Sequence, residues 1–189
     1  MRLFIAADLD AAARTIIAAE QKRLSVLLGS RSSIAWVQPE RMHLTMIFLG
    51  DVDESRAAAL TDVMGRAVDA VSFVATLQGL GVFPPHGPPR VLWIGMTDGA
   101  RELIDVQREI AARVLSVGIE AESHPFHPHL TIGRWRTSRS SDRRRALEVA
   151  KPGALARVRI DAATLFHSRL SSAGPVYTAL ARATLTPGA

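Results

Sequence analysis

The chain alternates between two kinds of hydrophobic pattern. Short apolar runs, some with a polar residue at every second position, predict strands, and apolar residues that recur every three or four positions predict amphipathic helices. The predicted strands cover residues 2–9, 34–37, 42–49, 71–82, 90–96, 129–135, 154–168 and 175–185. The predicted helices cover residues 11–28, 55–70, 99–117 and 141–149. Because several strands are close enough in sequence to pair as hairpins, we predict an α+β fold with mainly antiparallel sheet.

Capping and turn residues mark the ends of several elements. Asp10 is placed to cap the first helix and Gly29 to end it. Gly79 predicts a β-bulge within the strand over residues 71–82. Four prolines and a glycine between residues 83 and 89 exclude helix and strand. We therefore predict a loop there and expect it to contain the crossover between two lobes.

The order of elements occurs twice. The pattern over residues 90–98 matches that over residues 2–8, and each is followed by a helix, a short link and a His-Leu-Thr sequence. Two unrelated strand–helix units could give the same order by chance. We predict an internal two-fold repeat with units starting near residues 2 and 90, so that residues 1–189 form a single bilobal domain.

The His-Leu-Thr sequences bring polar residues into otherwise apolar strands. Side chains alternate between the two faces of a strand, so His43 and Thr45 share one face, and His129 and Thr131 do the same. Side by side, two such strands would place two imidazoles and two hydroxyls around one cleft. An imidazole gains or loses a proton near neutral pH, so this arrangement suits proton donation on one side of a substrate and proton removal on the other. The spacing leaves open which histidine does which.

The histidines have other possible roles. A single histidine on a strand is more often a hydrogen-bonded structural residue, but here it recurs in the same setting. His124, His127 and His129 could bind a metal together. However, two prolines constrain the backbone between them, and alternation points only the last two the same way. We expect no metal and no cofactor. The chain has no Gly-x-Ser-x-Gly elbow and no glycine-rich loop that leads into a helix.

Composition narrows the function classes further. With 189 residues, 48% of them hydrophobic, the chain can bury a substantial core. The absence of cysteine excludes disulfides, thiolate nucleophiles and Cys-based metal sites. The net charge of +5 comes almost wholly from arginine, which favours phosphate-bearing partners, although an arginine-rich overall composition gives the same balance. The apolar start is too short for a signal peptide and no run could span a membrane, so we expect a cytoplasmic protein without membrane attachment. We also expect a monomer.

Short sequences around the two motifs complete a family pattern. They are Arg-Leu-Phe-Ile-Ala from residue 2, Trp36-Val37, Phe48-Leu49-Gly50, the Pro-Phe-His-Pro-His of residues 125–129, and Gly174-Pro175-Val176-Tyr177. With the paired His-x-Thr-x tetrapeptides, they resemble the two-histidine (2H) phosphoesterase superfamily. The branch they resemble is the RNA 2',3'-cyclic phosphodiesterase, or 2'-5' RNA ligase-like, family. The resemblance runs from residue 2 to about residue 185.

The resemblance implies a fold and an activity. The fold is a bilobal α+β arrangement in which the motif strands face each other across a cleft. The activity is metal-independent hydrolysis of a terminal 2',3'-cyclic phosphate to a 2'-phosphate, with RNA or a nucleotide as the partner. His43 would be the acid that protonates the departing 3' oxygen, and His129 the base that activates water. Thr45 and Thr131 would donate hydrogen bonds to phosphate oxygens.

The resemblance gives roles to two further residues at an odd spacing from the histidines. Arg134, five residues after His129, would bind phosphate, and Phe48, five after His43, would stack on a base. A regular strand points both away from the cleft, so each strand must bulge or end first. Gly133 makes this easy before Arg134. Relatives commonly have a larger apolar residue there. No comparable residue precedes Phe48, for which core packing is the alternative.

Other functions share the same cleft. A nucleotide- or RNA-binding module could keep it without turnover. The same chemistry could also act on 2'-5'-linked or small cyclic nucleotides, including ligation in the reverse direction. Two separately placed proton-transfer groups favour an enzyme, because binding alone requires neither.

Overall fold

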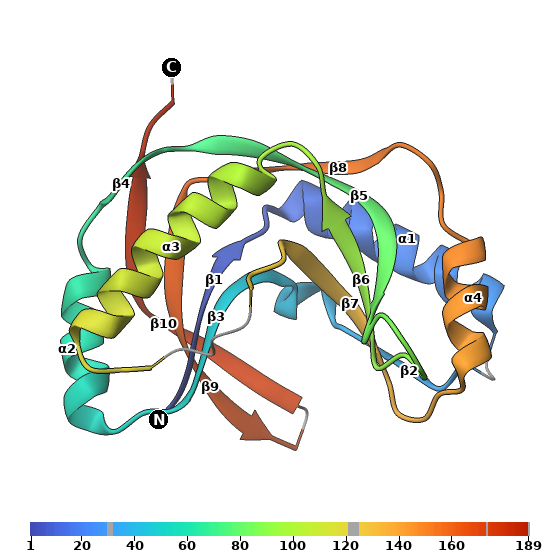
Figure 1. Cartoon of the computed structure of the whole chain (residues 1–189), viewed down its shortest axis with the longest axis horizontal. Coiled ribbons are helices and arrows are strands. Elements are labelled where there is room, and N and C mark those ends of the chain that lie inside the picture. Colours follow the sequence, from blue (N-terminus) through green and yellow to red (C-terminus); the bar gives the residue numbers. More distant parts are fainter. Residues whose placement is uncertain (30–31, 121–124, 173, 189) are drawn as a thin grey trace.

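A computed structural model of the chain describes residues 1–29, 32–120, 125–172 and 174–188. It contains two five-stranded sheets, with α-helices packed on their outer sides (Figure 1). Sheet 1 has the order β3-β1-β9-β10-β4, with β3 at His43–Asp51, β1 at Arg2–Asp8, β9 at Ala162–Ser171, β10 at Gly174–Thr186 and β4 at Val68–Val71. Sheet 2 has the order β2-β7-β6-β5-β8, with β2 at Ile34–Trp36, β7 at His129–Trp135, β6 at Val91–Met96, β5 at Phe73–Phe83 and β8 at Ala154–Ile160. Apart from the parallel pair of β10 and β4, the pairs are antiparallel, which confirms the α+β class.

The helices link the two halves of the chain. They are α1 at Ala11–Leu28, α2 at Glu54–Met64, α3 at Ala100–Ser116 and α4 at Ser140–Glu148, with a 3-10 turn, η2, at Pro39–Arg41. Although α1 follows β1 of sheet 1, it lies with sheet 2, and α3 follows β6 of sheet 2 but lies with α2 beside sheet 1 (Figure 1). The Gln21 side chain of α1 donates hydrogen bonds of 2.7 Å to the carbonyl of Ile132 and 2.9 Å to that of Val37. Each half thus supplies the helix that covers the other half.

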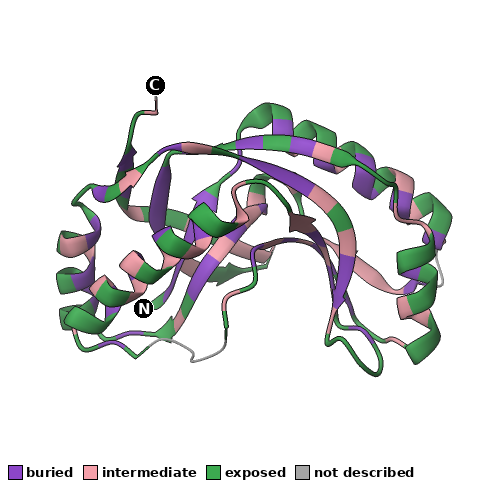
Figure 2. Ribbon diagram, turned by 45° about the horizontal axis from the view of Figure 1, so that its top comes forward, coloured by how far each residue is buried: buried purple, intermediate pink, exposed green. Residues whose placement is uncertain are grey.

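The helices face the sheets with buried aliphatic side chains. Ile17 and Leu24 of α1 and Leu103 and Ile110 of α3 are fully buried at helical spacing. Figure 2 shows the same division, with buried residues on the inner faces of helices and strands and exposed residues outside. Burial of each such side chain contributes roughly 1.5–3 kcal/mol. This core therefore holds in place the two sheets that contain the motif strands β3 and β7.

Local signals in the sequence set the ends of α1 as predicted. The Asp10 carboxylate accepts a 2.7 Å hydrogen bond from the backbone N–H of Ala13. Gly29 ends the helix with φ at 70°, in the left-handed range that glycine adopts easily. The bulge at Gly79 is also confirmed, because the pairing of β5 with β6 shifts there.

Three predictions about the connections are wrong. The helix predicted over residues 55–70 ends at Met64, and Val68–Val71 forms β4, because pairing with β10 outweighs the helical pattern. The strand predicted over residues 154–168 is two strands, β8 and β9, which belong to different sheets. The loop over residues 83–89 joins β5 to β6 within sheet 2, so the chain crosses between sheets earlier, from β4 to β5.

Candidate active site

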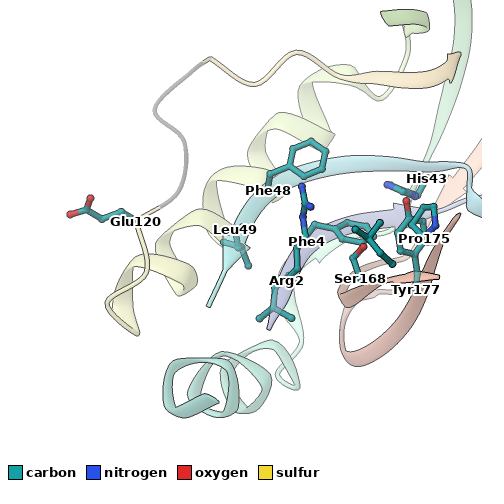
Figure 3. Close-up of a pocket in the computed structure, with 12 residues that line it drawn as sticks. Arg2, Phe4, His43, Phe48, Leu49, Glu120, Ser168, Pro175 and Tyr177 are labelled. Carbon is teal, nitrogen blue, oxygen red and sulfur yellow. The ribbon is translucent and has the colours of Figure 1, made fainter. Parts of the chain in front are cut away.

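The two motif strands bring their histidines to adjoining pockets between the sheets. His43 lines a cavity of about 490 Å³ whose wall includes Arg2, Phe4, Ser168 and Tyr177; we call it the His43 pocket (Figure 3). His129 lines a second cavity of about 470 Å³, the His129 pocket, with Thr45, Phe83, Phe126 and His127 in its wall. Phe48 lines both cavities. The pockets therefore form one cleft, with one motif histidine in each part.

A bulge in β3 brings Phe48 to the same face as His43. Along β1, Ala6 pairs with Thr45 but its neighbour Ile5 pairs with Ile47, so one residue of β3 is left over between them. The extra residue reverses the alternation, and Phe48 then pairs with Phe4 on the cleft side. The Phe48 and Phe4 rings lie 6.4 Å apart, and 53% of the Phe48 residue is exposed.

The second motif strand bulges at the equivalent place. Trp93 pairs with Thr131 and its neighbour Leu92 with Gly133, which leaves one residue of β7 over. Arg134 then pairs with Val91, two residues from Trp93 on β6, and so returns to the face of Thr131. A bulge two or three residues after each histidine therefore reconciles the odd spacing of Phe48 and Arg134 with a place on the cleft side.

Backbone carbonyls fix the orientation of both imidazoles. The ring nitrogen Nδ1 of His129 lies 2.7 Å from the carbonyl oxygen of His127. The ring of His43 likewise hydrogen-bonds to the backbone of Arg41, two residues before it. A carbonyl only accepts, so Nδ1 of His129 carries a proton and Nε2 is the nitrogen left to exchange protons with a substrate. Each motif thus repeats the same bond to the residue two positions earlier.

Aromatic rings pack against the two histidines. Phe4 lies 4.8 Å from the His43 ring, and Tyr177 meets that ring edge-on at 5.3 Å. Phe83 and Trp93 meet the His129 ring edge-on at 5.1 Å and 6.0 Å. These distances between ring centroids are typical of favourable aromatic contacts. Packing therefore limits how far either imidazole can turn.

Burial makes both histidines weaker bases than a free imidazole. The pKa of His43 is lowered from 6.5 to about 4, chiefly by burial; the hydrogen bond to the Arg41 backbone opposes this shift, and the charges of Arg14 and Arg134 contribute to it. Burial also lowers the pKa of His129, again opposed by its backbone hydrogen bond and assisted by the charges of His127 and Arg134. An anionic group bound between them would raise the pKa of each histidine. The cleft therefore takes up a proton most readily when an anion is bound.

The structure gathers most of the predicted site residues. His43, Thr45, Phe48 and His129 line the two pockets, and half-buried Thr131 follows His129 on the same face of β7. Arg134 is exposed, and its charge acts on both histidines. His124, the third member of the possible metal cluster, lies outside the described residues. Within the described ranges, no three His, Cys, Asp or Glu side chains come together in a way that could hold a metal ion.

Sequence reasoning missed the aromatic support of the cleft. Phe4, Trp93 and Tyr177 were assigned no part in the site, although each contacts a motif histidine. The place of Phe4 at the site depends on the pairing of β1 with β3, which alternation within β1 alone does not reveal. No local signal marks Trp93, because its contact with His129 depends on the pairing of β6 with β7.

Fold and site together define a two-histidine phosphoesterase-like protein, in which two strands with His-x-Thr motifs face one cleft. A family model described as the 2'-5' RNA ligase superfamily matches residues 13–171. The chain belongs to this superfamily. The described part of the chain contains no helix long and apolar enough to cross a membrane.

Several known proteins are similar over most of their length. An RNA 2',3'-cyclic phosphodiesterase of Aquifex aeolicus is 33% identical over 145 residues, which cover 76% of this chain and 77% of the relative. A protein of the same name from Methanothermobacter thermautotrophicus is 30% identical over 183 residues, covering 94% and 95%. Among solved structures, TT0787 of Thermus thermophilus matches with a TM-score of 0.78 and 27% identity over all of both chains. Escherichia coli LigT complexed with 3'-AMP matches with a TM-score of 0.76 and 28% identity over 98% of each chain.

Proposed function

We propose that this protein hydrolyses the 2',3'-cyclic phosphate at an RNA end to a 2'-phosphate. The observation that carries the proposal is the pair of imidazoles on facing strands, each oriented by a hydrogen bond that it donates to the backbone of the residue two positions earlier. The names of the relatives support the same activity. A binding module would need neither of these proton-transfer groups.

The reaction assigns each imidazole one proton transfer. Neutral His129 takes a proton from water as the water oxygen bonds to phosphorus. The bond from phosphorus to the 3' oxygen breaks, and protonated His43 gives its proton to that oxygen, which leaves a 2'-phosphate and a 3'-hydroxyl. Thr45, Thr131 and Arg134 are the donors we assign to the phosphate oxygens, whose charge grows during the displacement.

The assignment of acid and base follows the family resemblance, and leaving-group chemistry tests it. A p-nitrophenyl phosphodiester of a nucleoside needs no acid, because p-nitrophenolate leaves without a proton. His43→Ala should therefore lose on the order of a hundredfold in kcat on the cyclic phosphate but far less on the nitrophenyl ester. His129→Ala should lose similarly on both. The opposite pattern would exchange the two roles, and undiminished turnover in both variants would refute two-histidine catalysis.

The His129 pocket favours a second substrate class. In an in-line displacement the attacking group approaches from the side opposite the leaving oxygen, so it lies next to His129. The cavity there, of about 470 Å³, has room for a nucleoside as well as for water. A 2'-5'-linked dinucleotide is then a candidate substrate. Incubation of the protein with 2'-5'-linked diadenosine should yield a 2',3'-cyclic phosphate end and a free 5'-hydroxyl, and an unchanged dinucleotide would remove this candidate.

We also propose that residues 1–189 act as one bilobal unit, with repeats that start near residues 2 and 90. The exchange of α1 and α3 between the sheets supports this unit. We propose a cytoplasmic monomer, and size-exclusion chromatography with light scattering tests the oligomeric state.

A further inference from the structure

The His43 pocket extends well beyond the catalytic histidine. Arg2 and Phe4 lie on the same face of β1, one alternation step or about 6.6 Å apart. Figure 3 shows Phe4 between Arg2 and His43, so Arg2 occupies the end of the pocket that is remote from the reacting phosphate. Arg2 is exposed, and the described part of the structure gives its side chain no ion pair.

Positive charge surrounds Tyr177, which lies in the wall of this pocket. The charges of Arg41, Arg134 and Arg2, which come from three different elements, all act on the Tyr177 hydroxyl and oppose the rise in its pKa that burial causes. Glu120 is the single carboxylate in the wall of the pocket as described, and in Figure 3 it lies apart from the other labelled residues. The inner part of the pocket therefore suits an anion.

The covalent structure of the ribose indicates which anion would reach Arg2. Carbon C3' of the terminal nucleotide bears the 3' oxygen and is also bonded to C4', which leads through C5' to the 5' phosphate. Because His43 protonates the 3' oxygen in the proposed reaction, the C4' side of the ribose faces the His43 pocket. An RNA strand that ends in a cyclic phosphate would then continue towards Phe4 and Arg2.

We propose that Arg2 binds the phosphodiester on the 5' side of the terminal nucleotide. The substrate class of the cleft is then the end of an RNA strand in preference to a free nucleoside 2',3'-cyclic phosphate. This inference rests on the proposed function and deepens it. Ser168, which pairs with Tyr177 across the β9–β10 hairpin and also lines the pocket, adds a hydroxyl donor near the same anion.

Two substrates that differ only at the 5' position test the proposal. One is adenosine 2',3'-cyclic phosphate with a free 5'-hydroxyl, and the other carries a 5'-methyl phosphodiester, which adds the charge of an RNA linkage without a second nucleoside. The wild-type protein should have a kcat/KM on the order of tenfold or more higher for the methyl phosphodiester, as expected for a charge-assisted hydrogen bond. In Arg2→Gln this ratio should fall close to one.

A matched variant and the thermal midpoint control for general effects. Arg108→Gln removes the same charge from an exposed position on α3, where the described structure pairs Arg108 with its helix neighbour Asp105, and should keep the wild-type ratio. Arg2→Gln should keep the wild-type Tm, because Arg2 is exposed at the start of β1. Equal hydrolysis of both substrates by the wild type, or a ratio unaffected in Arg2→Gln, would overturn the subsite alone. Hydrolysis of neither would overturn the proposed function, and the subsite with it.

Discussion

The support of His129 by Trp93 leads to a specific prediction for Gly81. Gly81 of β5 lies directly against the Trp93 ring, and a Cβ atom on Gly81 would lie only 2.1 Å from Cζ2 of that ring. Ordinary contact begins at 3.4 Å, so Gly81→Ala should move the ring by roughly the difference between these distances. The indole N–H of Trp93 is buried and has no hydrogen-bond partner among the described residues, so packing alone holds the ring.

The displaced ring should affect catalysis more than stability. Overpacking of this kind costs about 1–3 kcal/mol of the free energy of unfolding, which lowers the Tm by several degrees in a protein of this size. Trp93 lies 6.0 Å from the His129 ring and 5.2 Å from that of His127. A misplacement of about 1 Å at a catalytic group can cost on the order of a hundredfold. We therefore expect Gly81→Ala to fold and to lose ten- to a hundredfold in kcat for a 2',3'-cyclic nucleotide.

Two further variants make the prediction specific. Gly79→Ala strains the backbone, because Gly79 has a φ of 76°, but its Cβ would meet no described atom within 4 Å. It should lose about 1–2 kcal/mol of stability and keep its kcat. Trp93→Phe removes the ring atoms that the new methyl group would meet, so it should restore kcat in the Gly81→Ala background. A kcat that stays at the wild-type value while the Tm of Gly81→Ala falls would refute the role of Trp93 in positioning His129.

The remaining predictions concern protons, metal and base recognition. Both limbs of the pH profile of kcat/KM should lie below 6.5, and Arg134→Gln should move them upward, because its charge lowers the pKa of both histidines; a limb above pH 7 contradicts this. As the pH falls from 6.5 to 4, His43 should cost the wild type up to about 3 kcal/mol of its free energy of unfolding, because only unfolded His43 binds a proton in that range. His43→Gln should lack this part of the loss when both proteins are measured by urea unfolding. Chelator should leave turnover intact, and restoration of lost activity by zinc or manganese would disprove this. Phe48→Ala should raise KM about tenfold for adenosine 2',3'-cyclic phosphate at unchanged Tm, since stacking contributes roughly 1–3 kcal/mol; a large fall in Tm would indicate core packing instead.

Elements with local signals could be predicted from the sequence. The cap at Asp10, the stop at Gly29 and the bulge at Gly79 each depend on the conformation of one residue and its near neighbours. The shared face of His43 and Thr45 follows from alternation over two residues and needs no knowledge of the partner strand. Each of these features therefore depends only on the strand or helix that contains it, and not on how the other elements are arranged.

Elements defined by distant partners could not be predicted in this way. Val68–Val71 continues a helical pattern, but its pairing with Leu185 and Thr186 of β10 makes it a strand. Similarly, residues 154–168 have a strand-like pattern throughout, but the chain passes from one sheet to the other at Asp161. The Asp161 carboxylate lies 2.7 Å from the Arg182 guanidinium, and its carbonyl accepts a hydrogen bond from the backbone N–H of Leu185. In both cases the interactions that override the local pattern come from β10. This strand lies about twenty residues after Asp161 and more than a hundred residues after β4.

The two bulges explain how a repeated motif produces a cleft with two different walls. Each motif strand places a histidine, a threonine and then, after one extra strand residue, the side chain five positions after the histidine on the cleft side. On β3 that side chain is the ring of Phe48, and on β7 it is the guanidinium of Arg134. A flat apolar surface on one wall and a cation on the other match the two parts of a nucleotide, its base and its phosphate. Because the bulge is common to both motif strands, the difference between the walls depends on the identity of one residue in each strand. Phe48→Arg should therefore give the cleft a cation on both walls without altering either histidine. This substitution separates the recognition of the base from the chemistry at phosphorus.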